Sequence, residues 1–169
     1  MLTRFLALAA FLLAPALPAQ ADARRVDLGD MDFAATVELA VQGPDGLYRF
    51  TADELEALGT YRIETATPWR EVPAVFDGVL LADILARAGL AERDSVRIVA
   101  ENDYAVIVPQ EVWATHGALL ATRVDGRPHS RRARGPLQIV FDMQARPDTG
   151  LASFEGNWVW MVAWIGPPD

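Results

Sequence analysis

Residues 76–90 read FDGVLLADILARAGL, and the apolar positions of this stretch recur at helical spacing. From Leu80 onward the leucine, isoleucine and alanine side chains share one face, while Asp83 and Arg87 form an i, i+4 pair of opposite charge on the other. Gly89 follows the last apolar position, where glycine commonly ends a helix. The stretch therefore predicts a short amphipathic helix that packs one face against a core.

Strand patterns flank this helix on both sides. A strand over 35–41, the turn GPDG at 43–46 and a return through 47–50 predict a hairpin. The capping box Thr51–Glu54 then starts a second short helix, which ends near Gly59. Further strands are expected over 60–66, 96–100, 104–108, 119–124, 136–141 and 158–165, with a loop over 67–73 and a short helix over 110–114. This excess of strands predicts an α+β domain, a mixed β-rich core with short helices on its surface.

Length and composition bound the function. The 169 residues contain no internal repeat and no long linker, which indicates one compact domain over 22–169. The 23 acidic residues outnumber the 15 basic ones, for a formal net charge of −8. This balance argues against nucleic acid as a partner, because phosphate recognition needs a basic face. The absence of cysteine excludes disulfides, cysteine nucleophiles, iron–sulfur clusters and thiolate zinc sites.

The first segment is typical of a secretory signal peptide. Arg4 precedes an apolar run over 5–17, and the segment ends in the cleavage-site pattern AQA at 19–21. The apolar run is shorter than the roughly 20 residues that cross a bilayer, so a membrane anchor is the weaker interpretation. We therefore expect residues 1–21 to be removed, leaving a secreted, periplasmic protein that does not span the membrane.

The sequence HSRRARGP at 129–136 is the clearest charge anomaly in this acidic chain. The guanidinium groups of Arg131, Arg132 and Arg134 could together grip phosphate, sulfate or carboxylate oxygens, because their planar donor forks match such anions. The alternative is a solvated loop whose arginines pair with nearby carboxylates. The glycine–proline pair leads the loop into an apolar strand, which places the arginines at a strand edge.

Two other loops are candidates for ligand contact. In the first, Asn102, Asp103 and Tyr104 offer an amide, a carboxylate and a phenol, although Asn-Asp is also ordinary turn chemistry. In the second, Thr67 and Trp69 stand where a strand ends and the chain turns sharply, although a tryptophan under a loop is commonly a core residue. The tryptophans of the last expected strand, at 158, 160 and 164, are interpreted as core packing.

The sequence lacks the motifs of common enzyme classes. It contains no glycine-rich phosphate loop, no G-x-S-x-G and no H-E-x-x-H. With only His116 and His129, a histidine-rich metal site cannot be built within one chain. We therefore assign no catalytic residue and no metal ligand, and we expect a non-catalytic protein.

The order of these segments resembles the molybdopterin-binding domain of the sulfite oxidase family of oxidoreductases, over roughly 37–165. The segments that carry the resemblance are 50–58 (FTADELEAL), 67–69 (TPW), 76–90, 96–100 (VRIVA), 102–106 (NDYAV), 126–128 (GRP), 135–140 (GPLQIV) and 158–160 (WVW). The resemblance implies the fold of that domain for residues 22–169.

Members of that family that carry out redox chemistry hold molybdenum through one cysteine thiolate, at the position that corresponds here to 65–68. That position reads TATP, and neither a hydroxyl nor a methyl group replaces a thiolate as a soft ligand. The chain thus looks like a small secreted member that lacks the molybdenum-ligating cysteine, for which we expect no cofactor. In the family, the corresponding loops line one cleft. The ligand-binding residues that the resemblance implies are Thr67, Trp69, Asn102, Asp103, Tyr104, Arg131, Arg132 and Arg134.

Three functions remain open from the sequence. The first is a periplasmic domain that binds a small anionic or polar ligand without turnover and presents it to a membrane sensor or a redox protein. The second is a molybdopterin-dependent oxidoreductase that holds the cofactor without a cysteine ligand, with arginines at its phosphate. The third is a structural partner whose tryptophan-rich last strand supports a protein interface.

Overall fold

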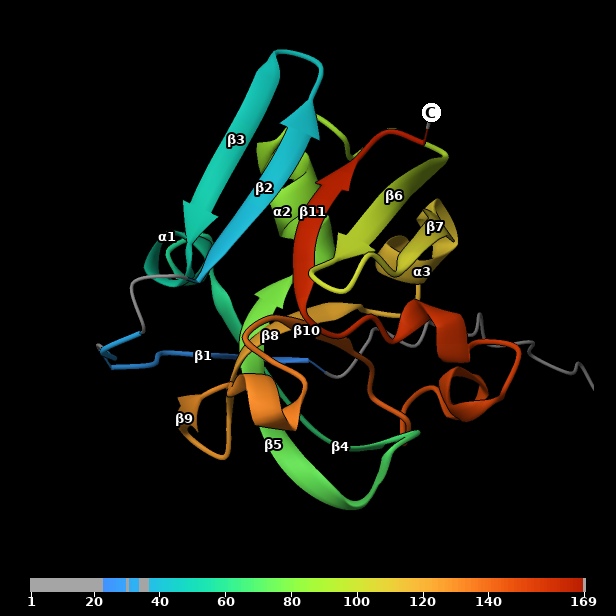
Figure 1. Cartoon of the computed structure of the whole chain (residues 1–169). Helices are drawn as coiled ribbons and strands as arrows, with labels where there is room; N and C mark the ends of the chain where they lie inside the picture. The colour runs from blue at the N-terminus through green and yellow to red at the C-terminus, as the bar shows by residue number, and fades with distance from the viewer. Residues whose placement is uncertain (1–22, 30, 34–36, 169) are drawn as a thin grey trace, which may run out of the picture.

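The computed structural model describes residues 23–29, 31–33 and 37–168, and two β-sheets form the body of the protein (Figure 1). The expected signal peptide over 1–21 lies outside the described residues. The first sheet has the order β1 (Arg24–Val26), β4 (Thr60–Thr67), β5 (Arg70–Leu80), β8 (Leu119–Val124) and β10 (Gln138–Val140), with β9 (Arg127–Pro128) paired to β8. The second sheet has the order β3 (Gly46–Thr51), β2 (Glu38–Gly43), β11 (Val162–Gly166), β6 (Ser95–Ala100) and β7 (Ala105–Pro109).

The helices are short. They are α1 (Ala52–Glu56), α2 (Leu81–Arg87) and α3 (Gln110–Ala114), with the 3₁₀ turns η1 (Arg131–Ala133), η2 (Pro147–Gly150) and η3 (Glu155–Asn157). Within the part of the chain that the structure describes, no helix has the length and apolar character needed to cross a membrane.

The predicted α+β class is wrong, because the protein is β-rich. Two sheets carry the core, and α2, the longest described helix, has only 7 residues. The expected amphipathic face is present, since Leu81, Ile84 and Leu85 are fully buried. Two helical turns nevertheless cover little of a sheet, so the core is closed mainly by strand side chains from both sheets. The part of the prediction that is confirmed is the mixed, β-rich core with few short helices.

The expected hairpin and capping box are confirmed. Strands β2 and β3 pair antiparallel, and Thr51 caps α1 by accepting from the Glu54 amide while the Glu54 carboxylate accepts from the Thr51 amide at 2.8 Å. The expected loop over 67–73 is wrong, because β5 already begins at Arg70. A register shift between Thr65 and Thr67 interrupts the β4–β5 pairing there.

The last strand is shorter than expected. β11 begins at Val162, and the preceding Met161 has a φ of 53°, a left-handed conformation that ends regular strand geometry. Residues 158–160 therefore do not continue β11, which lies parallel to β2 and antiparallel to β6. Trp160 instead forms an isolated antiparallel bridge to Gln138 of β10, and the Val159 carbonyl accepts from the Ile139 amide at 2.7 Å, so this segment lies against the first sheet.

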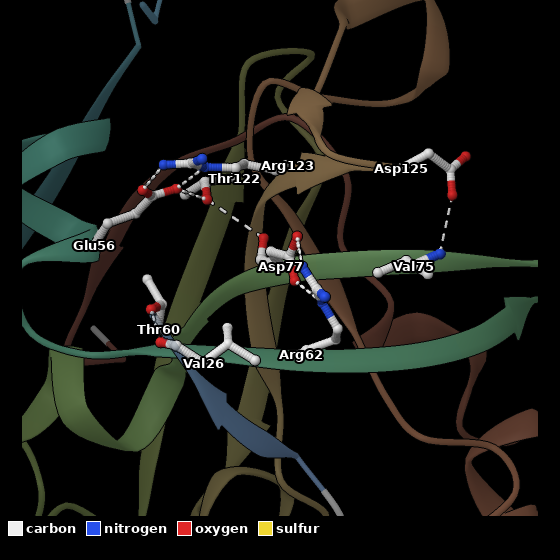
Figure 2. Close-up of polar contacts among 9 residues, drawn as sticks. All are labelled: Val26, Glu56, Thr60, Arg62, Val75, Asp77, Thr122, Arg123 and Asp125. Atoms are coloured by element: carbon white, nitrogen blue, oxygen red, sulfur yellow. Dashed lines mark hydrogen bonds and ion pairs between the residues drawn. The ribbon is translucent and has the colours of Figure 1, made fainter. Parts of the chain in front are cut away.

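A buried carboxylate fixes the first sheet (Figure 2). Asp77 on β5 has no exposed surface and accepts two hydrogen bonds from the Arg62 guanidinium on β4, at 2.6 and 3.0 Å. Beside it, Glu56 of α1 accepts from the Thr122 hydroxyl at 2.6 Å and from Arg123 Nε at 2.9 Å, both on β8. The Thr122 hydroxyl also lies 3.3 Å from the Asp77 carbonyl oxygen. The network ties three neighbouring strands to α1.

We expect Arg62→Met to lower the free energy of unfolding by about 2 kcal/mol, because it leaves the Asp77 carboxylate buried without its hydrogen-bonded charged partner. This is less than the roughly 3–5 kcal/mol of a fully buried pair, since the Arg62 side chain is 35% exposed to solvent. The measurement is urea unfolding of both proteins. Arg49→Met is the matched control, since Arg49 pairs with Glu38 at the exposed surface and surface pairs contribute about 0–1 kcal/mol. Equal losses in the two variants would contradict the structural role given to the Arg62–Asp77 pair.

Candidate ligand-binding site

Two neighbouring cavities share Trp69, the residue at the tip of the β4–β5 hairpin. The arginine cavity, of about 300 Å³, is lined by Thr67, Trp69, Arg70, Phe76, Val124, His129, Arg132, Ala133, Arg134 and Gln138. The aromatic cavity, of about 440 Å³, is lined by Trp69, Asn102, Tyr104, Ala152, Glu155, Gly156, Trp158, Val159 and Trp160. The lining residues of the arginine cavity come from the first sheet and from the loop before β10. Those of the aromatic cavity come mainly from the β6–β7 turn and from the segment between η2 and β11.

Positive charge is concentrated in the arginine cavity. Arg70, Arg132 and Arg134 all line it, and no carboxylate is among its described lining residues. Arg70 also reaches outward, where Nη2 lies 3.3 Å from the Asp125 carboxylate. Arg132 is exposed and makes no ion pair with any residue that the structure describes. The cavity therefore presents guanidinium donors whose charge is only partly neutralised.

The backbone of the arginine loop is held by hydrogen bonds of its own. The Ser130 carbonyl accepts from the amides of Ala133 at 2.9 Å and Gly135 at 2.8 Å. The Arg134 carbonyl accepts from the Met161 amide at 3.1 Å, which fastens the loop to the start of β11. Gly135 has to be glycine, because a Cβ there would run into the His129 backbone. The guanidinium groups thus project from a fixed loop.

Arg134 stacks on two tryptophans at the boundary of the cavities. Its guanidinium carbon lies 4.9 Å from the Trp69 ring centroid and 4.4 Å from that of Trp160. The two indole rings are themselves 4.6 Å apart, at an interplanar angle of 53°. Such cation–π contacts orient the guanidinium without neutralising its charge.

His129 is the buried titratable group of the arginine cavity. It is 5% exposed, and its Nε2 lies 2.9 Å from the Gln138 amide oxygen, which assigns the ring proton to Nε2. Its Nδ1 is buried and has no hydrogen-bond partner among the described residues. Burial lowers the pKa of His129 below its ordinary value; the hydrogen bond to Gln138 opposes this shift, and the charge of Arg70 adds to it. The ring is therefore neutral at pH 7.

Hydrogen bonds also position the walls of the aromatic cavity. The Tyr104 hydroxyl donates to the Gly156 carbonyl at 3.1 Å, which joins the β6–β7 turn to η3. Trp158 is buried and donates from its indole nitrogen to the Thr149 carbonyl at 2.7 Å. Glu155 is half-buried, and its carboxylate has no ion pair within the described ranges.

The structure brings together most of the residues expected at the site. Thr67, Trp69, Arg132 and Arg134 line the arginine cavity, and Asn102 and Tyr104, with Trp69 again, line the aromatic cavity. Ligand binding by these six residues stays a prediction.

Two expected residues line neither cavity. Arg131 turns to the surface and forms an ion pair with Glu101. Asp103 occupies an exposed turn at a φ of 66°, with its amide donating to the Ala100 carbonyl at 3.1 Å. The Asp103 carboxylate therefore adds no negative charge to the described lining of either cavity.

The expected site residues did not include five residues that line the cavities, namely Arg70, His129, Gln138, Glu155 and Trp160. His129 belongs to the basic segment at 129–136, so its position beside the arginines was a usable signal. Trp160 was assigned to core packing on a strand that in fact starts later, at Val162. Nothing in the sequence indicates Glu155, because the irregular segment 147–157 has no periodic pattern.

Residues 65–68, where the resemblance implies a molybdenum-ligating cysteine, do not fit a molybdenum ligand. The Thr65 hydroxyl donates to the Ala66 carbonyl at 3.0 Å and accepts from the Met143 amide at 3.2 Å. The Thr67 hydroxyl accepts from the Trp69 amide at 3.4 Å. Both hydroxyls serve the local backbone, and the chain contains no cysteine that could supply a thiolate.

Comparison with known proteins adds a likeness of fold. No family model and no curated protein matches the chain. Among solved structures, the chain is similar to the sulfane dehydrogenase SoxCD from Paracoccus pantotrophus, with a TM-score of 0.56 and 15% identity over 82% of this chain. The match covers 40% of the dehydrogenase chain, so the present chain corresponds to about two fifths of its length. At this identity, what the two proteins share is a fold, here the fold of part of an oxidoreductase.

Proposed function

We propose that this protein binds a small anion in the arginine cavity and carries out no redox turnover of its own. In this proposal it is a small secreted, periplasmic relative of an oxidoreductase domain that lacks the metal-ligating cysteine. It presents the bound anion to a membrane sensor or a redox protein. The exported location follows from the signal-peptide pattern at 1–21.

The observation that carries the proposal is the placement of charge. In a chain of net charge −8, three arginines line one cavity whose described lining residues include no carboxylate, and of the three Arg70 alone has a described carboxylate partner, Asp125. Grouping like charges is unfavourable unless an anion offsets them, and the guanidinium fork binds carboxylate, sulfonate or phosphate oxygens with two parallel hydrogen bonds. The backbone of the loop is fixed by its own hydrogen bonds, so binding requires little rearrangement of the main chain.

A second candidate is the oxidoreductase that binds molybdopterin through its phosphate and pterin alone. The likeness to a dehydrogenase favours it. Arg132 and Arg134 would then hold the phosphate, while the threonines at 65 and 67 leave the metal without a protein thiolate. Retention of the cofactor through gel filtration, followed by its fluorescence after release, separates this candidate from simple anion binding. A protein that leaves the column free of cofactor contradicts it.

We expect Arg132→Ala to weaken the binding of methanesulfonate or acetate about tenfold, because a charge-assisted hydrogen bond contributes about 1.5–3 kcal/mol and part of this is screened at an exposed group. Isothermal titration calorimetry measures the change. Arg127→Ala is the matched control, since Arg127 is an exposed arginine on β9 that lines neither cavity. Equal affinity in the Arg132 variant and the wild type would contradict the proposed site.

We expect the free energy of unfolding to fall as the pH drops below about 6.5, the ordinary pKa of histidine. The folded protein lowers the pKa of His129, so the unfolded chain binds more protons below that pH and acid favours unfolding. Methanesulfonate, whose charge is constant over this range, should offset part of the loss, because an anion beside His129 favours its protonated ring. Urea unfolding at pH 7.5 and 5.5, with and without the anion, tests both effects.

His129→Gln is the control for this pH dependence, because it keeps a polar side chain that does not titrate. The variant should lose less stability between pH 7.5 and 5.5 than the wild type. Its affinity for methanesulfonate should also change less with pH. An unchanged pH profile in this variant would show that other groups carry the effect.

A further inference from the structure

We propose that the ligand is zwitterionic, with its anionic group in the arginine cavity and an alkylated ammonium group in the aromatic cavity. This inference rests on the proposed function, because it assigns the second half of the same ligand. The two cavities share Trp69, so one small molecule can reach from one to the other past this side chain.

The walls of the aromatic cavity suit a cation. Its lining residues include Trp69, Tyr104, Trp158 and Trp160, and the faces of aromatic rings attract positive charge. The protein already shows this attraction, because the Arg134 guanidinium stacks at 4.9 and 4.4 Å from two of these rings. Arg134 lines the arginine cavity and is not part of the aromatic lining, so the aromatic cavity itself contains no described basic side chain.

Glu155 decides between a cationic and a neutral occupant. It is the charged residue among the described lining of the aromatic cavity, and its carboxylate has no ion pair among residues 23–29, 31–33 and 37–168. A neutral apolar group would displace water from the Glu155 carboxylate without supplying a hydrogen bond or an opposite charge, and this desolvation is unfavourable. An ammonium group offsets the charge instead, and its alkyl substituents contact the rings.

The two cavities therefore carry opposite charge patterns. One combines three arginines with no described carboxylate, and the other combines aromatic rings and one carboxylate with no described basic side chain. A monovalent anion would satisfy only the first pattern. A molecule with an acid group and a quaternary or methylated ammonium group satisfies both.

The test compares zwitterions with carbon isosteres of the same shape. Trimethylglycine is compared with 3,3-dimethylbutanoate, and 4-(trimethylammonio)butanoate is compared with 5,5-dimethylhexanoate. Isothermal titration calorimetry on residues 22–169 measures the four affinities. In each pair a quaternary nitrogen is replaced by carbon and the carboxylate is kept. We expect the zwitterion of at least one pair to bind at least tenfold more tightly than its isostere.

Glu155→Gln should abolish this preference while leaving the affinity for the carbon isostere within about twofold. Trp160→Leu should also reduce the preference, and thermal melting of each variant verifies that it is folded. Glu64→Gln is the matched control, because Glu64 is exposed on β4 and lines neither cavity. It should leave both affinities unchanged.

The outcomes separate this inference from the proposed function. If the carbon isosteres bind as tightly as the zwitterions, the zwitterionic ligand is wrong and the anion site stands. If the zwitterions are preferred but Glu155→Gln does not change the preference, the assignment of the aromatic cavity is wrong. If neither the zwitterions nor the isosteres nor methanesulfonate binds, the proposed function fails as well.

Discussion

The rest of the structure depends on the burial of the Asp77 carboxylate between strands of the first sheet. A charge without exposed surface is tolerated only with close partners, and Arg62 supplies two hydrogen bonds from the neighbouring strand. This pairing fixes β4 against β5, and the opposite end of the same hairpin carries Trp69. Glu56 and β8 extend the network, so the helix after β3 is joined to the sheet that supports the site.

The sequence predicted elements whose causes are local. The hairpin of β2 and β3, the capping box at Thr51 and the buried face of α2 follow from turn residues, capping chemistry and helical spacing, all of which act within about ten residues. The fold class and the last strand were wrong, because they depend on how two sheets share one core and on a positive φ at Met161 that has no sequence signal.

The grouping of the candidate residues was predictable in part, and their binding of a ligand stays a prediction. The resemblance to a known domain brought together three loops distant in sequence, and the structure places residues of all three around two cavities. It could not separate Arg131 from Arg132, because the 3₁₀ turn sends adjacent side chains to different sides, one to Glu101 and the other to the cavity. Glu155 lies in an irregular segment, where only tertiary contacts define position.

The hydrogen bond from the Met161 amide to the Arg134 carbonyl connects the arginine loop to the residue just before β11, the central strand of the second sheet. Because β11 lies between β2 and β6, the loop inherits the rigidity of a strand with neighbours on both sides. If the proposed anion binds here, its capture costs mainly side-chain rotamer entropy and little backbone entropy. Selectivity in a rigid pocket of this kind depends on how well the shape and charge of the ligand match the pocket. Movement of the loop does not help a poorly matched ligand to fit.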